Sequence, residues 1–186
     1  MDSKKIRLIA ALSMLSALAV ASTLVIRVPF GFAPPHMRYD PQDVFILIGG
    51  FIYGPVAAAA VSAVVALTRF AISATTGHWG LLMNFLATAS FAVPAAWVYM
   101  RHKTFKGAAA ALIAGIMVMI PTMLLLNYLV VPLFAPRVTR EDVMAMLIPI
   151  ILPFNLLKGG INMALVLLMY KPLMAALKKI NIIKAE

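Results

Sequence analysis

Amide and ammonium side chains interrupt otherwise apolar sequence at several places. In "ILPFNLLKGG", residues 151–160, Asn155 and Lys158 stand three residues apart and therefore on one face of a helix. Asn127 in "LLLNYLVV" and Asn84 in "LLMNFLA" are likewise enclosed by residues that cannot hydrogen-bond them. Amides both donate and accept hydrogen bonds, whereas an ammonium only donates. Because a small polar ligand needs a few convergent polar groups within apolar walls, these residues predict a binding site.

A second interpretation of the same residues stays open. Lys158 could snorkel to the membrane interface while the asparagines bridge neighbouring helices by hydrogen bonds. A lysine at mid-bilayer depth costs about 2.5–3.5 kcal/mol on insertion scales, so it usually faces the bundle interior or a watery cavity. The three asparagines and the lysine fall at similar depth, near the outer ends of apolar runs and beside a loop rich in proline and aromatic residues. That clustering favours the ligand site.

The remaining residues predict neither catalysis nor metal binding. The chain has no cysteine, and its three histidines are scattered in loops. The sequence contains no His-Glu-x-x-His helix, Gly-rich phosphate loop or Walker lysine, so any coupling to ATP has to come from a partner. The acids all lie outside the apolar runs: Asp2, Asp40, Asp43, Glu141, Asp142 and Glu186. A membrane-embedded enzyme is therefore disfavoured.

The composition is that of an integral membrane protein. Of 186 residues, 63% are hydrophobic and 12% charged, whereas soluble domains average about 45–50% and about 25%. The net charge of +10 does not indicate nucleic-acid binding, because the basic residues sit at the ends of apolar runs without interleaved aromatics. The N-terminus imitates a secretory signal, but its apolar run continues to Ile26, which favours a membrane span.

The apolar runs divide into six expected helices. Residues 44–73 are too long for one ordinary span, and "GGFIYGP" interrupts them: Gly54 loosens the backbone, and Pro55 suits a helix start. The short second helix has to be tilted or sheltered by its neighbours. The expected helices are at about 5–26, 43–53, 55–73, 80–100, 107–131 and 147–170.

The basic residues favour the six-helix arrangement. With six spans, both termini lie on one side, which then holds ten of the sixteen lysines and arginines. With five spans, the split becomes seven on the N-terminal side against nine opposite, contrary to the positive-inside bias. The sequence therefore predicts an all-α integral membrane protein, a single domain over residues 1–186 with six transmembrane helices and both termini cytoplasmic.

Two further features concern the outer loop and the first span. Residues 27–42, "RVPFGFAPPHMRYDPQ", are too irregular for a helix and too apolar for a solvated linker, which suits a folded lid. In the first span, Ala10, Ser13, Ala17 and Ala21 form one narrow face of small side chains. Such a face allows close approach of another helix, either within this chain or in a partner.

Five segments together resemble a known family. "MRYDPQDVFILIGGFIYGP", "TTGHWGLLMNFL", "KTFKGA", "LLNYLVVPLF" and "PFNLLKG" occur in the order and spacing of the substrate-binding S components of energy-coupling factor (ECF) transporters, of the riboflavin type. The resemblance covers nearly the whole chain. It implies a six-helix protein of the plasma membrane with cytoplasmic termini, the S-component fold and no enzymatic activity. Riboflavin is then a transported substrate captured beneath the outer lid, not a cofactor. The implied partners are a transmembrane T component and two cytoplasmic ATPase subunits.

The resemblance also implies roles for individual residues. Asn127, Asn155 and Lys158 match ligand-contacting positions of the family, and Tyr39, Trp79 and Asn84 lie in the neighbourhood of its motifs. Flavin rings need apolar walls, for which Phe154 and Trp79 are candidates. The family's signature for docking the T component matches Ala17 and Ala21. Two alternatives remain: an S component for another vitamin, and a self-sufficient small transporter or channel with Lys158 on its permeation path.

Overall fold

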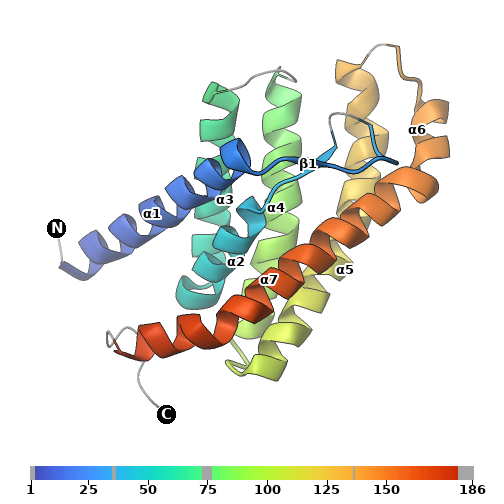
Figure 1. Ribbon diagram of the computed structural model, residues 1–186. Coiled ribbons are helices and arrows are strands. Elements are labelled where there is room, and N and C mark those ends of the chain that lie inside the picture. Colours follow the sequence, from blue (N-terminus) through green and yellow to red (C-terminus); the bar gives the residue numbers. More distant parts are fainter. Residues whose placement is uncertain (1–2, 35–36, 73–76, 136, 180–186) are drawn as a thin grey trace.

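The computed structural model is a bundle of tilted helices (Figure 1). It describes residues 3–34, 37–72, 77–135 and 137–179, with side chains through residue 175. The helical elements are α1 (Ser3–Val25), α2 (Gln42–Tyr53), α3 (Pro55–Ile72), α4 (Gly77–Tyr99), α5 (Phe105–Phe134), α6 (Arg140–Met146), the π-helix η1 (Leu147–Ile151) and α7 (Leu152–Lys179). The expected helix end at residue 73, part of the expected lid and both chain ends lie outside the described residues.

Five described helical segments are long and apolar enough to cross a membrane. They are α1, α3, α4, α5 and the continuous segment Arg140–Ala175, which contains α6, η1 and most of α7. The twelve-residue α2 is a shorter apolar helix. In Figure 1 the α4–α5 connection and the end of α7 lie at the bottom, while the end of α3 and the start of α6 lie at the top. Successive helices therefore run in alternating directions.

The short helix α2 is sheltered by its neighbours. It ends at Gly54, whose φ of 91° is readily adopted only by glycine, and Pro55 begins α3, as the sequence indicates. α2 packs against α1, α3, α4 and α7. At Gly50 an added Cβ would lie 3.0 Å from the side chains of both Ala58 and Ala96, so the absence of a side chain lets the three helices approach closely. Nearly all of α2 is consequently buried.

Several boundaries differ from the sequence-based expectation. α4 begins at Gly77, so Trp79 lies in a helical first turn rather than in a loop. The last span begins earlier than residue 147: Thr139 and Asp142 form a capping box that starts α6, and a π-turn joins α6 to α7. The π-helical turn contains Pro149. Such a turn changes the direction in which the following side chains point from the helix axis. α7 also continues beyond residue 170, to Lys179.

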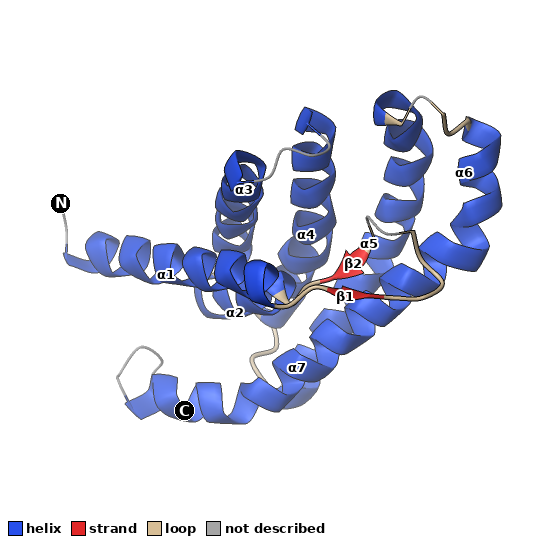
Figure 2. Cartoon of the chain, turned by 45° about the horizontal axis from the view of Figure 1, so that its top comes forward, coloured by secondary structure: helices blue, strands red, loops and turns tan. Residues whose placement is uncertain are grey.

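The loop between α1 and α2 contains a small antiparallel hairpin. β1 (Val28–Pro29) pairs with β2 (Arg38–Tyr39), with Val28 opposite Tyr39. Figure 2 shows the two strands between the end of α1 and the start of α2, alongside α7. The irregular sequence predicts a folded lid, and the structure shows that this fold is a hairpin. Its residues 35–36 lie outside the described part of the chain.

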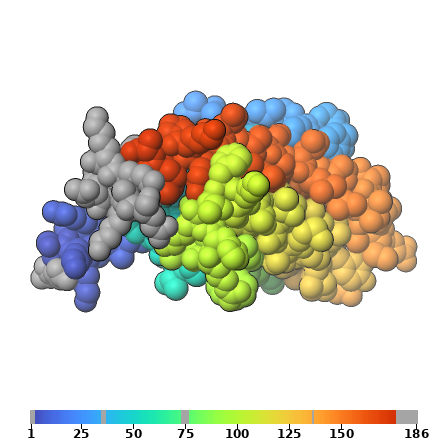
Figure 3. Space-filling model, turned by 90° about the horizontal axis from the view of Figure 1, so that it is seen from below, coloured from blue at the N-terminus to red at the C-terminus, as the bar shows by residue number. Residues whose placement is uncertain are grey.

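The core lies between the helices that hold the site. α4 packs along both α3 and α5, and α5 also packs against α7. Seen from below, the surface of α7 adjoins those of α4 and α5 (Figure 3). At the C-terminal end of α4, the Tyr99 and Tyr170 hydroxyls are hydrogen-bonded at 2.9 Å, and Phe51 stacks on Tyr99. These contacts hold α7 against α2 and α4. They therefore determine the direction in which the polar side chains of α7 point.

Candidate binding site

Lys158 points into the bundle and forms a buried ion pair. Its Nζ lies 3.2 Å from Asp43 Oδ2 and 3.8 Å from Asp40 Oδ1. The Lys158 side chain is 12% exposed and that of Asp43 only 2%. Because the ammonium meets carboxylates inside the protein, the interpretation that Lys158 snorkels to the interface is wrong.

The two acids were missed by the sequence analysis as site residues. Asp40 precedes α2 and Asp43 lies in its first turn, outside the apolar runs, yet both are buried. A position outside the apolar runs therefore does not put these acids at the surface of the protein. A signal was present in the sequence: Asp43 stands at the start of an apolar segment that is too short to cross a membrane alone. One end of such a helix has to lie inside the protein.

Hydrogen bonds extend this ion pair in both directions. Asn162 Nδ2 donates to Asp43 Oδ2 at 3.0 Å, and the Tyr39 hydroxyl donates to Asn162 Oδ1 at 2.9 Å. On the other side, Arg69 Nη1 donates to Asp40 Oδ2 at 3.0 Å and to Gln42 Oε1 at 2.8 Å. We call this set the polar network: Tyr39, Asp40, Gln42, Asp43, Arg69, Lys158 and Asn162. It joins the hairpin, α2, α3 and α7.

The charges of the polar network are balanced, two carboxylates against Arg69 and Lys158. Balance matters because an unpaired buried charge is strongly destabilising. At the edge of the network, burial and the neighbouring carboxylates Asp43 and Asp40 raise the pKa of Tyr39 to about 12. The Tyr39 phenol is therefore a neutral donor at ordinary pH.

Asn127 and Asn155 each direct one N–H at a backbone carbonyl and leave Oδ1 as an acceptor. Asn127 Nδ2 donates to Met123 O at 2.7 Å, and Asn155 Nδ2 donates to Ile151 O at 2.8 Å. A backbone carbonyl can only accept, so the amide nitrogen has to face it and Oδ1 is left for another donor. Both bonds stay within one helix, which contradicts the interpretation that these asparagines bridge helices.

Aromatic rings lie where the hairpin meets α7. Phe154 is buried, and the Phe30 ring meets it edge-on with centroids 5.7 Å apart. Phe30 also stacks on Phe32 at 5.8 Å and lies 6.5 Å from the Tyr39 ring. Phe154 was expected as an apolar wall, whereas Phe30 was not singled out. Its loop position gave no periodic signal.

Trp79 and Asn84 lie apart from the polar network on α4. Among the described residues, no hydrogen bond, ion pair or ring contact joins either side chain to the network. Asn84 Oδ1 is buried and has no hydrogen-bond partner in the described part of the chain. Their place in the site stays a prediction.

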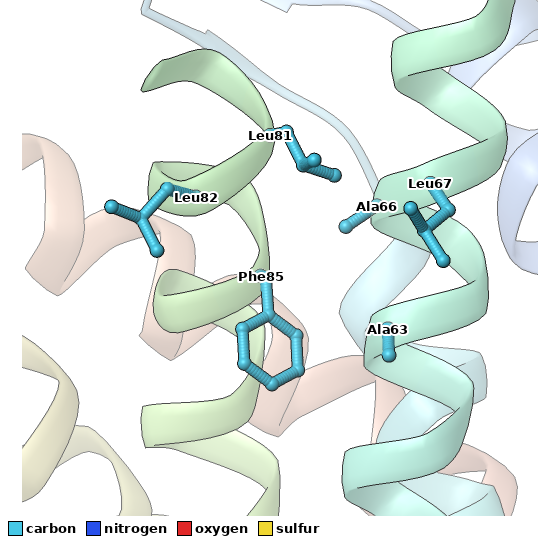
Figure 4. A pocket seen from close by; sticks show the side chains of 6 residues that line it. All are labelled: Ala63, Ala66, Leu67, Leu81, Leu82 and Phe85. Carbon is cyan, nitrogen blue, oxygen red and sulfur yellow. The ribbon is translucent and has the colours of Figure 1, made fainter. Parts of the chain in front are cut away.

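A hollow between α3 and α4 is a separate feature (Figure 4). Its lining is entirely apolar: Ala63, Ala66, Leu67, Leu81, Leu82 and Phe85. Figure 4 shows these side chains projecting from the two helices toward the space between them. Because none of them can hydrogen-bond, the hollow lacks the donors and acceptors that a polar ligand requires.

The small-residue face of α1 is exposed. Ala10, Ser13, Ala17 and Ala21 all lie on the surface of this chain, while Leu15, Ser16, Ala19, Val20 and Thr23 face the bundle. The alternative in which the small face packs within the same chain is therefore wrong. The described residues also contain no group of three or more His, Cys, Asp or Glu side chains that could hold a metal ion.

Comparisons with known proteins agree on one family. A family profile described as ECF transporter, substrate-specific component, matches residues 7–170. The chain is 33% identical over 174 residues to the riboflavin transporter RibU of Staphylococcus aureus (strain TCH60), covering 91% of each protein. It is 31% identical over 163 residues to the riboflavin transporter FmnP of Bacillus subtilis (strain 168), covering 83% of this chain and 85% of FmnP.

A solved structure supports the same assignment. The S component of a bacterial ECF transporter superposes with a TM-score of 0.79 and 32% sequence identity, covering 94% of this chain and 99% of the other. The resemblance seen in the sequence motifs is thereby confirmed, and the family consists of transporter components, not enzymes. The chain thus belongs to the substrate-specific S components of ECF transporters and is a multi-pass protein of the plasma membrane.

Proposed function

We propose that this S component captures riboflavin as its transported substrate, beneath the β1–β2 hairpin and beside the polar network. The observation that carries the proposal is that two relatives, each about a third identical over most of the chain, are both riboflavin transporters. The chemistry of the candidate site agrees with such a ligand.

Riboflavin has a flat, largely apolar isoalloxazine ring with carbonyl and imide groups at one rim. Asn127 and Asn155 each have a free Oδ1 that can accept from the imide N–H. Lys158 has N–H groups beyond the one directed at Asp43, and these can donate to a flavin carbonyl. Phe154 and Phe30 offer aromatic surface to the ring.

The wall of the site on α4 is less defined. Trp79 lies in the first turn of α4. Asn84 follows it by five residues, and its Oδ1 is buried and without a partner among the described residues. We propose Trp79 as additional aromatic surface and Asn84 as a further hydrogen-bonding group, to be tested separately from Asn127 and Asn155.

Transport needs partners that this chain does not supply. We infer that a transmembrane T component docks on the exposed face of Ala10, Ser13, Ala17 and Ala21, where small side chains permit close helix packing. Two cytoplasmic ATPase subunits would supply energy, since the sequence has no phosphate-binding loop. From the distribution of the basic residues we infer that both termini lie on the cytoplasmic side.

The proposal is tested by the absorbance spectrum of the purified protein, before and after adding riboflavin. We expect a yellow preparation with flavin bands, or a colourless one that acquires tightly bound flavin on mixing. Thiamine and biotin serve as controls for another vitamin as substrate. A colourless protein that retains no added riboflavin after gel filtration contradicts the proposal, and retention of another vitamin instead identifies a different substrate.

A further inference from the structure

Asp43 lies at the centre of the polar network without being in the expected site. Its Oδ2 lies 3.2 Å from Lys158 Nζ in an ion pair and accepts a hydrogen bond from Asn162 Nδ2. We propose that Asp43 is a positioning residue: its carboxylate aims the Lys158 ammonium at the ligand and, through Asn162, holds Tyr39 of the hairpin in place. The part concerning the ligand rests on the proposed riboflavin site.

Asp43 is placed to set the direction of the Lys158 side chain. A lysine side chain is flexible, and its ammonium has three donors that rotate freely. Asp43 Oδ2, at 3.2 Å, is close enough to direct one of them, whereas Asp40 Oδ1, at 3.8 Å, contributes only its charge. Asp43 therefore fixes the position of Nζ and leaves the remaining N–H groups for a ligand.

Two residues on one face of α7 both contact Asp43. Lys158 and Asn162 are four positions apart, so they lie one above the other on the helix. Both converge on the same oxygen of Asp43, which stands at the start of α2. A single carboxylate oxygen thus fixes two neighbouring α7 side chains at once.

Asn162 links Asp43 to the hairpin through hydrogen bonds. Because Asn162 directs Nδ2 at the carboxylate, its Oδ1 faces the other way and accepts from the Tyr39 hydroxyl at 2.9 Å. Tyr39 belongs to β2, which pairs with β1. If the Asp43 carboxylate is lost, the Asn162 amide is free to rotate, and the attachment of the hairpin weakens.

Asp40 has a different role, although it lies in the same network. Its Oδ2 accepts from Arg69 at 3.0 Å, and its Oδ1 lies 3.8 Å from Lys158 Nζ, farther away than Asp43 Oδ2 at 3.2 Å. Asp40 and Arg69 therefore balance each other's charge, which leaves Asp43 as the matching charge for Lys158.

A double-mutant cycle on riboflavin binding tests the first part. If Asp43 acts through Lys158, Asp43→Asn should weaken binding about tenfold, which corresponds to about 1.4 kcal/mol. In a Lys158→Met background the same change should weaken binding less than about twofold. If Asp43→Asn weakens binding by the same factor in the wild type and in the Lys158→Met background, the positioning role is overturned. The control, Glu141→Gln, removes one exposed negative charge from α6 and should leave the dissociation constant unchanged.

Folding is followed by the melting temperature of each variant in detergent. The Asp43→Asn/Lys158→Met variant removes both charges of the pair and keeps the interior neutral. Where Asp43→Asn alone is unfolded, Asp43→Glu replaces it in the cycle: it retains the charge but displaces the carboxylate by one methylene. It should fold and still bind more weakly, and wild-type binding by Asp43→Glu overturns the requirement for a positioned carboxylate.

The hairpin provides a readout that needs no ligand. The chain has no cysteine, and an added Cβ at Gly31 meets no atom within 4 Å, so Gly31→Cys can carry a nitroxide. In the unliganded protein, Asp43→Asn and Tyr39→Phe should both increase nitroxide mobility in the electron paramagnetic resonance spectrum, whereas Lys158→Met should not. Failure of the wild type to bind riboflavin contradicts the proposed function alone. An unchanged nitroxide spectrum in Asp43→Asn contradicts the role of Asp43 in the hairpin.

Discussion

The Lys158 ammonium of α7 lies 3.2 Å from the Asp43 carboxylate of α2, and both side chains are buried. This pair joins two parts of the polar network that are far apart in the sequence, the start of the short helix and the last span. It also means that Lys158 has two tasks, balancing a buried carboxylate and donating to a ligand. A change at Lys158 therefore affects stability as well as binding.

The first prediction is that Lys158→Ala lowers stability. Removing one partner of a buried ion pair typically costs about 3–5 kcal/mol, because the remaining charge is left uncompensated. We expect a lower melting temperature in detergent than for the wild type, and substantial recovery in Lys158→Met/Asp43→Asn. A wild-type melting temperature for Lys158→Ala would show that the pair is hydrated and unimportant for folding.

The second prediction concerns Tyr39 and alkaline pH. Tyr39→Phe should lose about 1 kcal/mol of stability with the hydrogen bond to Asn162. Because the pKa of Tyr39 is raised to about 12, the folded protein retains this proton more tightly than the unfolded chain, whose tyrosine pKa is about 10. The stabilising contribution is therefore complete below pH 10 and is lost as the pH rises through 12.

Melting temperatures of the wild type and Tyr39→Phe across this pH range provide the measurement. The difference between them should be constant from pH 7 to 9 and should shrink above pH 10. A difference that grows at alkaline pH would mean that the phenolate, not the phenol, is the form stabilised by folding.

The third prediction concerns the exposed small-residue face of α1. Ala17→Trp/Ala21→Trp should leave riboflavin binding by the isolated protein intact, because both positions lie on the surface. Uptake by cells expressing the whole transporter should collapse, since bulky side chains prevent close helix approach. The matched control is Ile113→Trp/Met117→Trp, two exposed positions with the same spacing on α5. Normal uptake by the α1 variant would refute the docking role.

The fourth prediction concerns topology. Cysteines introduced at Ser3 and Lys103 should be protected from an impermeant thiol reagent in intact cells, whereas one at Arg137 should react. The native chain has no cysteine, so no background needs removing. Labelling at Lys103 from outside would contradict the cytoplasmic placement of the α4–α5 connection.

Much of the helical architecture could be predicted from local pattern. The apolar runs, the break at Gly54-Pro55 and the shared face of Asn155 and Lys158 all follow from the residues themselves. The π-turn η1 could not be located, because it depends on how Pro149 is accommodated between α6 and α7.

The local sequence pattern could not predict which residues contact Lys158. Asp43 is separated from Lys158 by most of the chain, and only the packing of α2 against α7 brings them together. Asn162 could have been noticed, because it is an amide in apolar sequence four residues after Lys158. Its orientation toward both Asp43 and Tyr39, however, is a tertiary property.

The most direct test of the riboflavin site is a fluorescence-quenching titration of the purified wild type, Asn127→Ala and Asn155→Ala. Each substitution removes an acceptor that the amide orientation leaves free, so each should weaken riboflavin binding by about 1–3 kcal/mol. The control is Thr122→Ala. Thr122 also hydrogen-bonds a carbonyl of α5 but is only half-buried, and the dissociation constant of this variant should equal that of the wild type. Unchanged dissociation constants for both asparagine variants would contradict a riboflavin site at this end of α5 and α7.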